Sequence, residues 1–230
     1  MKRGFYTIMS AQFFSSLADN ALFVAAVELL RTSGAPEWQR AALVPMFALF
    51  YVVLAPFVGA FADALPKGRV MFFSNAIKIV GCLMMLFGSH PLIAYAVVGL
   101  GAAAYSPAKY GILTELLPAS QLVKANGWIE GLTIASIILG VLLGGQLVGH
   151  HLSAALLSID IPMIDFGIHT AAEAAIAALI LVYALAAWFN TRIPHTGVEM
   201  RPLRQHPQRS ILASTLALLP DFWACNSRLW

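Results

Sequence analysis

Long apolar runs separated by short polar connections form the main pattern of this sequence. The runs cover about residues 5–30, 41–62, 70–89, 91–108, 126–149 and 171–189. Each run is close to the roughly 20 residues that a helix needs to cross about 30 Å of hydrocarbon. A membrane β-barrel would show alternating segments of about ten residues, and lipid allows only helices or closed barrels to span it. The pattern therefore predicts an all-α membrane protein with a bundle of six transmembrane helices.

Composition supports lipid as the solvent of most of the chain. Of the 230 residues, 60% are hydrophobic and only 11% are charged, and the mean hydropathy is +0.78. A soluble domain carries about 25% charged residues. We therefore expect a six-span transmembrane domain over residues 1–189. Over residues 190–230, arginines and prolines replace the apolar runs, and we expect a cytoplasmic linker followed by a truncated tail.

The distribution of Lys and Arg between the connections predicts the orientation in the membrane. One side carries the following cations: Lys2, Arg3, Lys67, Arg69, Lys109, Lys124, Arg192, Arg201, Arg204, Arg209 and Arg228. The opposite side carries only Arg31 and Arg40. Because cytoplasmic loops are enriched in Lys and Arg, we expect both termini in the cytoplasm. The cations form no basic patch, so nucleic acid is not an expected partner.

The fifth connection, over about residues 150–170, differs from the others in length and charge. It contains no Lys or Arg, as expected for an external loop. Its stretch Leu152–Phe166 is apolar enough to lie along the membrane surface.

Asp19 is the most unusual residue of the first run. It lies about 13 residues into the run, roughly 20 Å along the helix axis and near the middle of the membrane. A charge there costs about 2.5–3.5 kcal/mol, so it normally faces a partner or a cavity. One interpretation is a buried acid that pairs with Asn20 or a neighbouring Lys for packing alone. The other is a carboxylate that couples transport to a proton or cation, or that contacts the amine of a headgroup.

Two lysines are further candidates, Lys78 at hydrocarbon depth and Lys109 at the end of the fourth run. Lys78 is about eight residues into the third run, where it either faces the bundle interior or extends to the cytoplasmic surface. Lys109 follows Pro107, which removes a backbone donor and is expected to break the fourth helix locally. A broken helix beside a cation suits a phosphate site, and the alternative is a positive anchor at the helix end. Glu130 is expected to pair with Lys109 or Lys78 in a structural role.

The connection between the second and third runs carries the strongest local motif. Its sequence is Gly59-Ala-Phe-Ala-Asp63-Ala-Leu-Pro-Lys67-Gly68-Arg69. This resembles the loop motif of the major facilitator superfamily, in which a glycine permits close helix approach, an aspartate caps or pairs across the cytoplasmic face, and basic residues close the turn. Gly68 follows Asp63 by five positions, where the family usually has three. The resemblance implies a gating loop, and the alternative is a simple positive-inside hairpin with a helix-end acid.

Four further segments carry a closer resemblance. They are Asp19-Asn20-Ala-Leu, Lys67-Gly-Arg-Val70 with Asn75-Ala-Ile-Lys78, Ala102-Ala-Ala-Tyr105-Ser-Pro-Ala-Lys109-Tyr-Gly-Ile-Leu113, and Lys124-Ala-Asn-Gly127. Together they resemble bacterial lysophospholipid transporters over about residues 5–149. The resemblance implies the N-terminal half of a major facilitator superfamily fold, in a secondary transporter that moves lysophospholipids such as lysophosphatidylethanolamine across the bacterial inner membrane. It implies substrate-binding or coupling roles for Asp19, Asn20, Lys78 and Lys109, with membrane lipid and a downstream acyltransferase as partners.

Two other functions compete with this one. A facilitator-superfamily efflux pump for amphipathic drugs would share the fold and the loop motif. A membrane acyltransferase would need a His-x4-Asp pair or another nucleophile and base, and no histidine here has an aspartate at that spacing. The histidines show no metal-ligand spacing and the two cysteines lie in different regions, so we expect no enzyme, metal or other cofactor. The sequence also lacks a Gly-x4-Gly-Lys-[Ser/Thr] phosphate loop, so ATP is not an expected energy source.

Six spans amount to one half of such a transporter. Facilitator-type proteins place the substrate between two six-helix halves that move against each other. We therefore expect the 230-residue chain to insert into the membrane but not to transport by itself.

Overall fold

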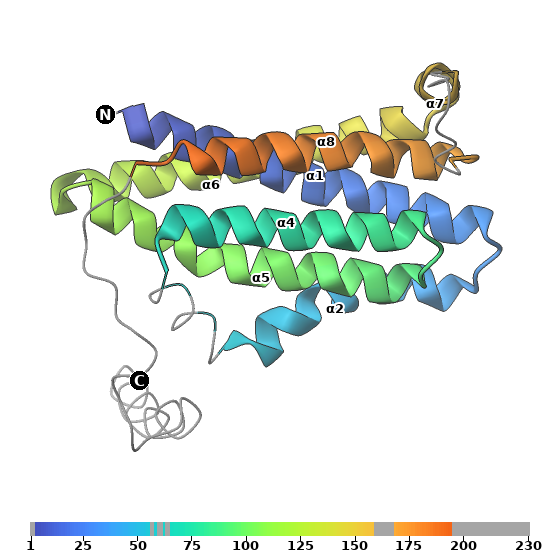
Figure 1. The fold of residues 1–230 in the computed structure, drawn as a ribbon, viewed down its shortest axis with the longest axis horizontal. Helices are drawn as coiled ribbons and strands as arrows, with labels where there is room; N and C mark the ends of the chain where they lie inside the picture. The colour runs from blue at the N-terminus through green and yellow to red at the C-terminus, as the bar shows by residue number, and fades with distance from the viewer. Residues whose placement is uncertain (1–2, 56–57, 59–61, 63–64, 159–167, 195–230) are drawn as a thin grey trace, which may run out of the picture.

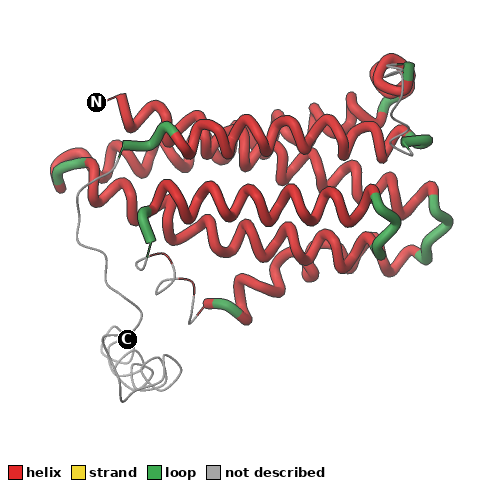
Figure 2. The backbone as a smooth tube through the Cα atoms, viewed as in Figure 1, coloured by secondary structure: helices red, strands yellow, loops and turns green. Residues whose placement is uncertain are grey.

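Every regular element in the described part of the chain is an α-helix (Figure 2). The computed structural model describes residues 3–55, 58, 62, 65–158 and 168–194. Its helices are α1 (Arg3–Thr32), α2 (Glu37–Val53), α4 (Lys67–Leu86), α5 (Pro91–Leu116), α6 (Ala119–Val148), α7 (His150–Leu157) and α8 (Ala171–Thr191). The predicted all-α fold is confirmed. The predicted linker and tail lie outside the described residues from residue 195 onward.

Each long helix runs antiparallel to the long helix before it in the chain, so successive connections lie at alternate ends of the bundle (Figure 1). Five of the described helices, α1, α4, α5, α6 and α8, are long and apolar enough to cross a membrane. The predicted run 41–62 corresponds to α2, which begins at Glu37 and has 17 described residues. Most of residues 56–62 lie outside the described part. Turns after α1 and α4 use Gly34 and Gly88 at φ 69° and 77°, where a residue with a Cβ would be strained.

α1 lies between the other long helices and packs against α6 and α8, with further contacts to α5 and α2. The close approach of α6 depends on Gly140 and Gly144. An added Cβ would lie 2.6 Å from the carbonyl oxygen of Leu17 at the first position and 2.7 Å from that of Ala21 at the second. Small residues allow membrane helices to pack at this separation. Three other glycines of α6 face open space: Gly127, Gly131 and Gly145.

α4 packs along α5, with glycine again at the contact. At Gly101 an added Cβ would lie 2.6 Å from the carbonyl oxygen of Ser74 and 2.8 Å from Cγ of Lys78. The stem of Lys78 therefore lies against a part of α5 that has no side chain. α5 continues through Pro107 to Leu116, so the predicted break in this helix is wrong. Proline removes one hydrogen bond of the helix, and packing against neighbouring helices holds the remaining turns together.

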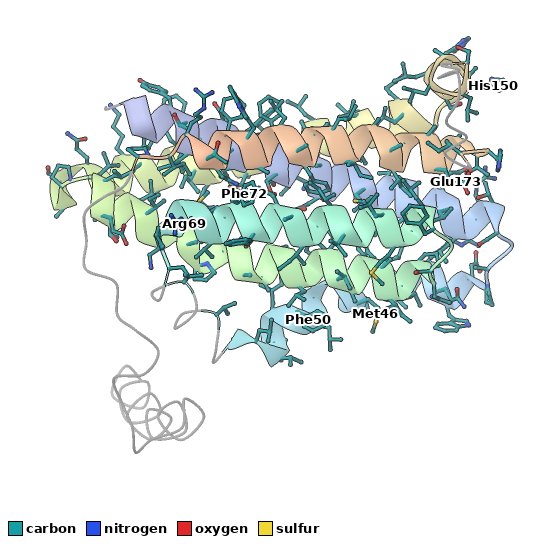
Figure 3. All side chains as sticks on the ribbon, viewed as in Figure 1. Met46, Phe50, Arg69, Phe72, His150 and Glu173 are labelled. Atoms are coloured by element: carbon teal, nitrogen blue, oxygen red, sulfur yellow. The ribbon has the colours of Figure 1, made fainter. Side chains whose placement is uncertain are left out.

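The fifth connection contains the short helix α7, which is seen end-on in Figure 1 and therefore crosses the direction of the long helices. It packs against α6 and α8. A capping box then begins α8: the Thr170 hydroxyl accepts from the Glu173 backbone N–H, and the Glu173 carboxylate accepts from the Thr170 N–H. His150 and Glu173 lie at the end of the bundle opposite Arg69 (Figure 3). The predicted surface location of Leu152–Phe166 stays a prediction, because residues 159–167 lie outside the described part.

Candidate functional site

An ion pair between Asp19 and Lys78 lies at the middle of the bundle. The Lys78 ammonium donates to Asp19 Oδ2 at 2.7 Å. Asp19 is 16 residues after the start of α1 and 13 before its end, and Lys78 is 11 after the start of α4 and 8 before its end. Both charges are therefore far from either end of their helices. Lys78 is 1% exposed, so its side chain does not extend to the cytoplasmic surface.

Tyr183 of α8 is the second hydrogen-bond donor to the Asp19 carboxylate. Its hydroxyl donates to Asp19 Oδ1 at 2.7 Å, and the tyrosine is fully buried. Each carboxylate oxygen thus has one short hydrogen bond, from two helices that are far apart in sequence. Hydrogen bonds to charged groups are about twice as strong as those between neutral groups. Asp19 therefore holds α1, α4 and α8 together.

A second polar contact lies beside the ion pair. Lys78 also donates to Ser15 Oγ at 2.9 Å, and this hydroxyl donates to Asn75 Oδ1 at 2.7 Å. The Lys78 ammonium lies 5.3 Å from the ring centroid of Tyr105 and 5.6 Å from that of Tyr183. Aromatic faces attract cations at this distance. The ammonium of Lys78 thus has both polar and aromatic neighbours.

Asn20 and Lys109 do not join this cluster. The Asn20 amide donates to the backbone oxygen of Ser16, so the predicted pairing of Asp19 with Asn20 is wrong, and the pairing with a lysine is the one observed. Lys109 lies over the ring of Tyr110, at 4.4 Å from its centroid. Glu130 accepts from the Tyr110 hydroxyl at 2.7 Å. No ion pair of Glu130 with either lysine is found among the described residues, so that expectation is wrong.

The loop motif is described only in part. The Lys67 ammonium donates to the Ala62 oxygen at 2.7 Å and lies 4.0 Å from the Glu115 carboxylate. Gly68 allows the start of α4 to approach α8, since an added Cβ would lie 3.3 Å from the Asn190 oxygen. Arg69 is exposed near the same end of the bundle (Figure 3). The two other members of the predicted gating loop, Gly59 and Asp63, lie outside the described residues.

Sequence reasoning missed Ser15, Asn75 and Tyr183. A helical periodicity would have indicated the first two, because Ser15 lies four residues before Asp19 and Asn75 three before Lys78. Each pair therefore shares one face of its helix. Tyr183 carries no such local signal. Only the packing of α8 against α1 and α4 brings its hydroxyl to the carboxylate.

The fold and this cluster define a polytopic helical membrane protein with ionisable groups at mid-membrane, the usual arrangement in channels and transporters. The model of the Major Facilitator Superfamily matches residues 8–227. The chain belongs to this superfamily, which confirms the predicted fold class.

Relatives of this chain include proteins named lysophospholipid transporters. The chain is 44% identical over 207 residues to the lysophospholipid transporter LplT of Yersinia enterocolitica and equally so to that of Yersinia pestis. Both alignments cover 88% of this chain and 46% of the relative, so the chain spans about half the length of the curated relatives it matches. Among solved structures, it is similar to an inward-facing, unoccupied bacterial homologue of the human lysosomal transporter Spinster. The TM-score is 0.66 at 20% identity, covering 89% of this chain and 47% of that one, and this likeness concerns the fold alone.

Proposed function

We propose that this chain forms the N-terminal half of a secondary transporter that moves lysophospholipids such as lysophosphatidylethanolamine across the bacterial inner membrane for reacylation. The similarity to proteins named lysophospholipid transporters supports this substrate class. The observation that carries a transport role is the Asp19–Lys78 ion pair at the middle of the bundle. Ionisable groups at that depth are costly and commonly mark a substrate or ion pathway.

The predicted site residues take separate roles in this proposal. Asp19 and Lys78 form a pair whose opening and closing accompanies movement of α1 against α4. Asn20, on the side of α1 that meets Gly140 of α6, takes part in the same coupling. Lys109 receives the lipid phosphate, because a cation in a low-dielectric site attracts an anion strongly.

The motif that precedes and begins α4 is proposed as the cytoplasmic gate. Its members are Gly59, Asp63, Lys67, Gly68 and Arg69, of which the last three form the first turn of α4. The contact of Lys67 with Ala62 and the packing of Gly68 on α8 support a loop fixed to its own half-bundle. A gate of this kind opens when the opposing half moves away from it.

The proposed orientation places both termini in the cytoplasm of the bacterial cell. Lys67 and Arg69 lie in the first turn of α4, whereas Arg31 lies in the last turn of α1 and Arg40 in the first turn of α2, at the other end of the bundle (Figure 1). The positive-inside rule supports the first end as cytoplasmic. An acyltransferase that consumes the imported lysolipid is the proposed downstream partner.

Uptake by a complete transporter tests the function. The chain is joined to the C-terminal half of the Y. enterocolitica relative and reconstituted in liposomes with labelled lysophosphatidylethanolamine. We expect saturable uptake that Asp19→Asn abolishes. Glu28→Gln is the matched control, since this acid lies on the same helix in an exposed pair with Arg31. Normal uptake by Asp19→Asn would contradict the role of Asp19, and efflux of an amphipathic dye without lysolipid competition would favour a drug pump instead.

A further inference from the structure

The acids of the described residues are all matched by a cation or a helix cap, with one exception. The matched ones are Asp19 with Lys78, Glu28 with Arg31, Glu37 with Arg40, Glu115 with Lys67, and Glu173 in its capping box. Glu130 has no cation within 4.0 Å in the described part of the chain. Its only hydrogen bond there comes from the Tyr110 hydroxyl at 2.7 Å. Within the described ranges, one carboxylate of the bundle therefore makes no direct ion pair.

Lys109 is the corresponding cation. Its residue is 6% exposed, and within the described ranges it makes no hydrogen bond and no ion pair. Its ammonium lies 4.4 Å from the centroid of the Tyr110 ring. A cation–π contact offsets only part of the cost of taking an ammonium out of water. This cation and this acid thus contact the same tyrosine, the cation at its ring face and the acid at its hydroxyl.

The position of these residues suits a ligand in the membrane. Lys109 is seven residues before the end of α5, about 10 Å along the axis, and Glu130 is eleven after the start of α6, about 16 Å. α5 and α6 meet at the end of the bundle where the N-terminus lies (Figure 1). Glu130 is exposed and Tyr110 is 43% exposed, so both reach the surface of this half-bundle. At Asp19, in contrast, both carboxylate oxygens already have donors.

We propose that Lys109, Tyr110 and Glu130 form a clamp for the zwitterionic phosphoethanolamine headgroup, with Lys109 binding the phosphate and Glu130 binding the lipid ammonium. This rests on the proposed lysophospholipid transport and names the residues that recognise the amine. The phosphate of such a headgroup pairs with Lys109 and its ammonium pairs with Glu130. Because the headgroup is a zwitterion, it adds no net charge to the membrane interior. Because the two protein charges contact different parts of Tyr110, its ring face and its hydroxyl, the headgroup bridges them.

Lipid binding by the joined transporter, purified in maltoside, tests the clamp. The affinity for lysophosphatidylethanolamine is compared with that for lysophosphatidylglycerol, which has the phosphate but no amine, by titrating the thermal unfolding midpoint. Glu130→Gln should weaken binding of the first lipid about tenfold, the scale of a lost hydrogen bond to a charged group, and leave the second within about twofold. Lys109→Gln should weaken both. Glu28→Gln, at a paired acid, is the control and should change neither.

The outcomes separate the clamp from the function on which it rests. Retained binding of lysophosphatidylglycerol shows that Glu130→Gln is folded. If wild type binds both lipids and Glu130→Gln weakens neither, or weakens both equally, the clamp is wrong and lysolipid transport stands. If wild type binds neither lipid, the proposed function and the clamp are contradicted together.

Discussion

Two pairs of oppositely charged residues in this bundle differ in whether their charges are in direct contact. Asp19 and Lys78 meet at 2.7 Å in the middle of the membrane, with further hydrogen bonds from Tyr183 and to Ser15. Nearer the end of the bundle where α5 meets α6, Lys109 lies over the ring of Tyr110, and Glu130 accepts from the hydroxyl of the same tyrosine. The comparison teaches that burial of a charge does not identify a binding site by itself. The Asp19–Lys78 pair joins two helices and changes only if they move apart, whereas Lys109 and Glu130, which make no direct ion pair in the described part of the chain, are available to a ligand.

The largest effect is expected from breaking the satisfied pair. Lys78→Met removes the cation and leaves Asp19 as an uncompensated charge, which should lower the free energy of unfolding by about 3–5 kcal/mol. The double variant Asp19→Asn with Lys78→Met should recover most of this loss, because neither charge remains. The free energy of unfolding is measured in mixed detergents for wild type, Asp19→Asn, Lys78→Met and the double variant. Additive losses in the double variant would show that the two residues are not coupled in this way.

An intermediate effect is expected where glycine makes room for Lys78. Gly101→Ala would place a Cβ 2.6 Å from the Ser74 oxygen and 2.8 Å from Lys78 Cγ, so α4 and α5 must separate or the lysine must move. We expect a loss of about 1–3 kcal/mol in the same unfolding measurement. Gly131→Ala is the matched control in open space, where the higher helix propensity of alanine should stabilise by up to about 1 kcal/mol. Equal effects of the two substitutions would contradict a packing role for Gly101.

The sequence predicted the spans and the unusual depth of Asp19 and Lys78, because apolar run length and the rarity of charge in hydrocarbon are local properties. For the partner of Asp19 it left Asn20 and a neighbouring Lys as alternatives, and the second is the one observed. Which of two nearby lysines meets the carboxylate depends on the rotation of α4 and α5 about their axes, and apolar runs of this kind define no rotation. The expected break at Pro107 failed for a related reason, since the cost of proline was judged without the neighbouring helices that support α5.

The smallest effect on stability is expected at Lys109, and this is what distinguishes the two regions. Lys109→Gln removes a buried charge that has no acidic partner in the described structure. The lost cation–π contact, about 0.5–1 kcal/mol, is therefore opposed by relief of the desolvation cost. We expect the free energy of unfolding to change by less than about 1 kcal/mol.

Lysolipid uptake by the joined transporter should respond differently from stability at this position. Lys109→Arg retains the charge that the proposed phosphate contact requires, whereas Lys109→Gln does not, so uptake should survive in the first variant and fall in the second. Equal uptake by both would show that the charge is unnecessary and that the residue is an anchor. A loss of stability in Lys109→Gln as large as that of Lys78→Met would instead show that Lys109 has a structural charge partner. The two regions would then be equivalent, and the unmatched charges would no longer distinguish a ligand site.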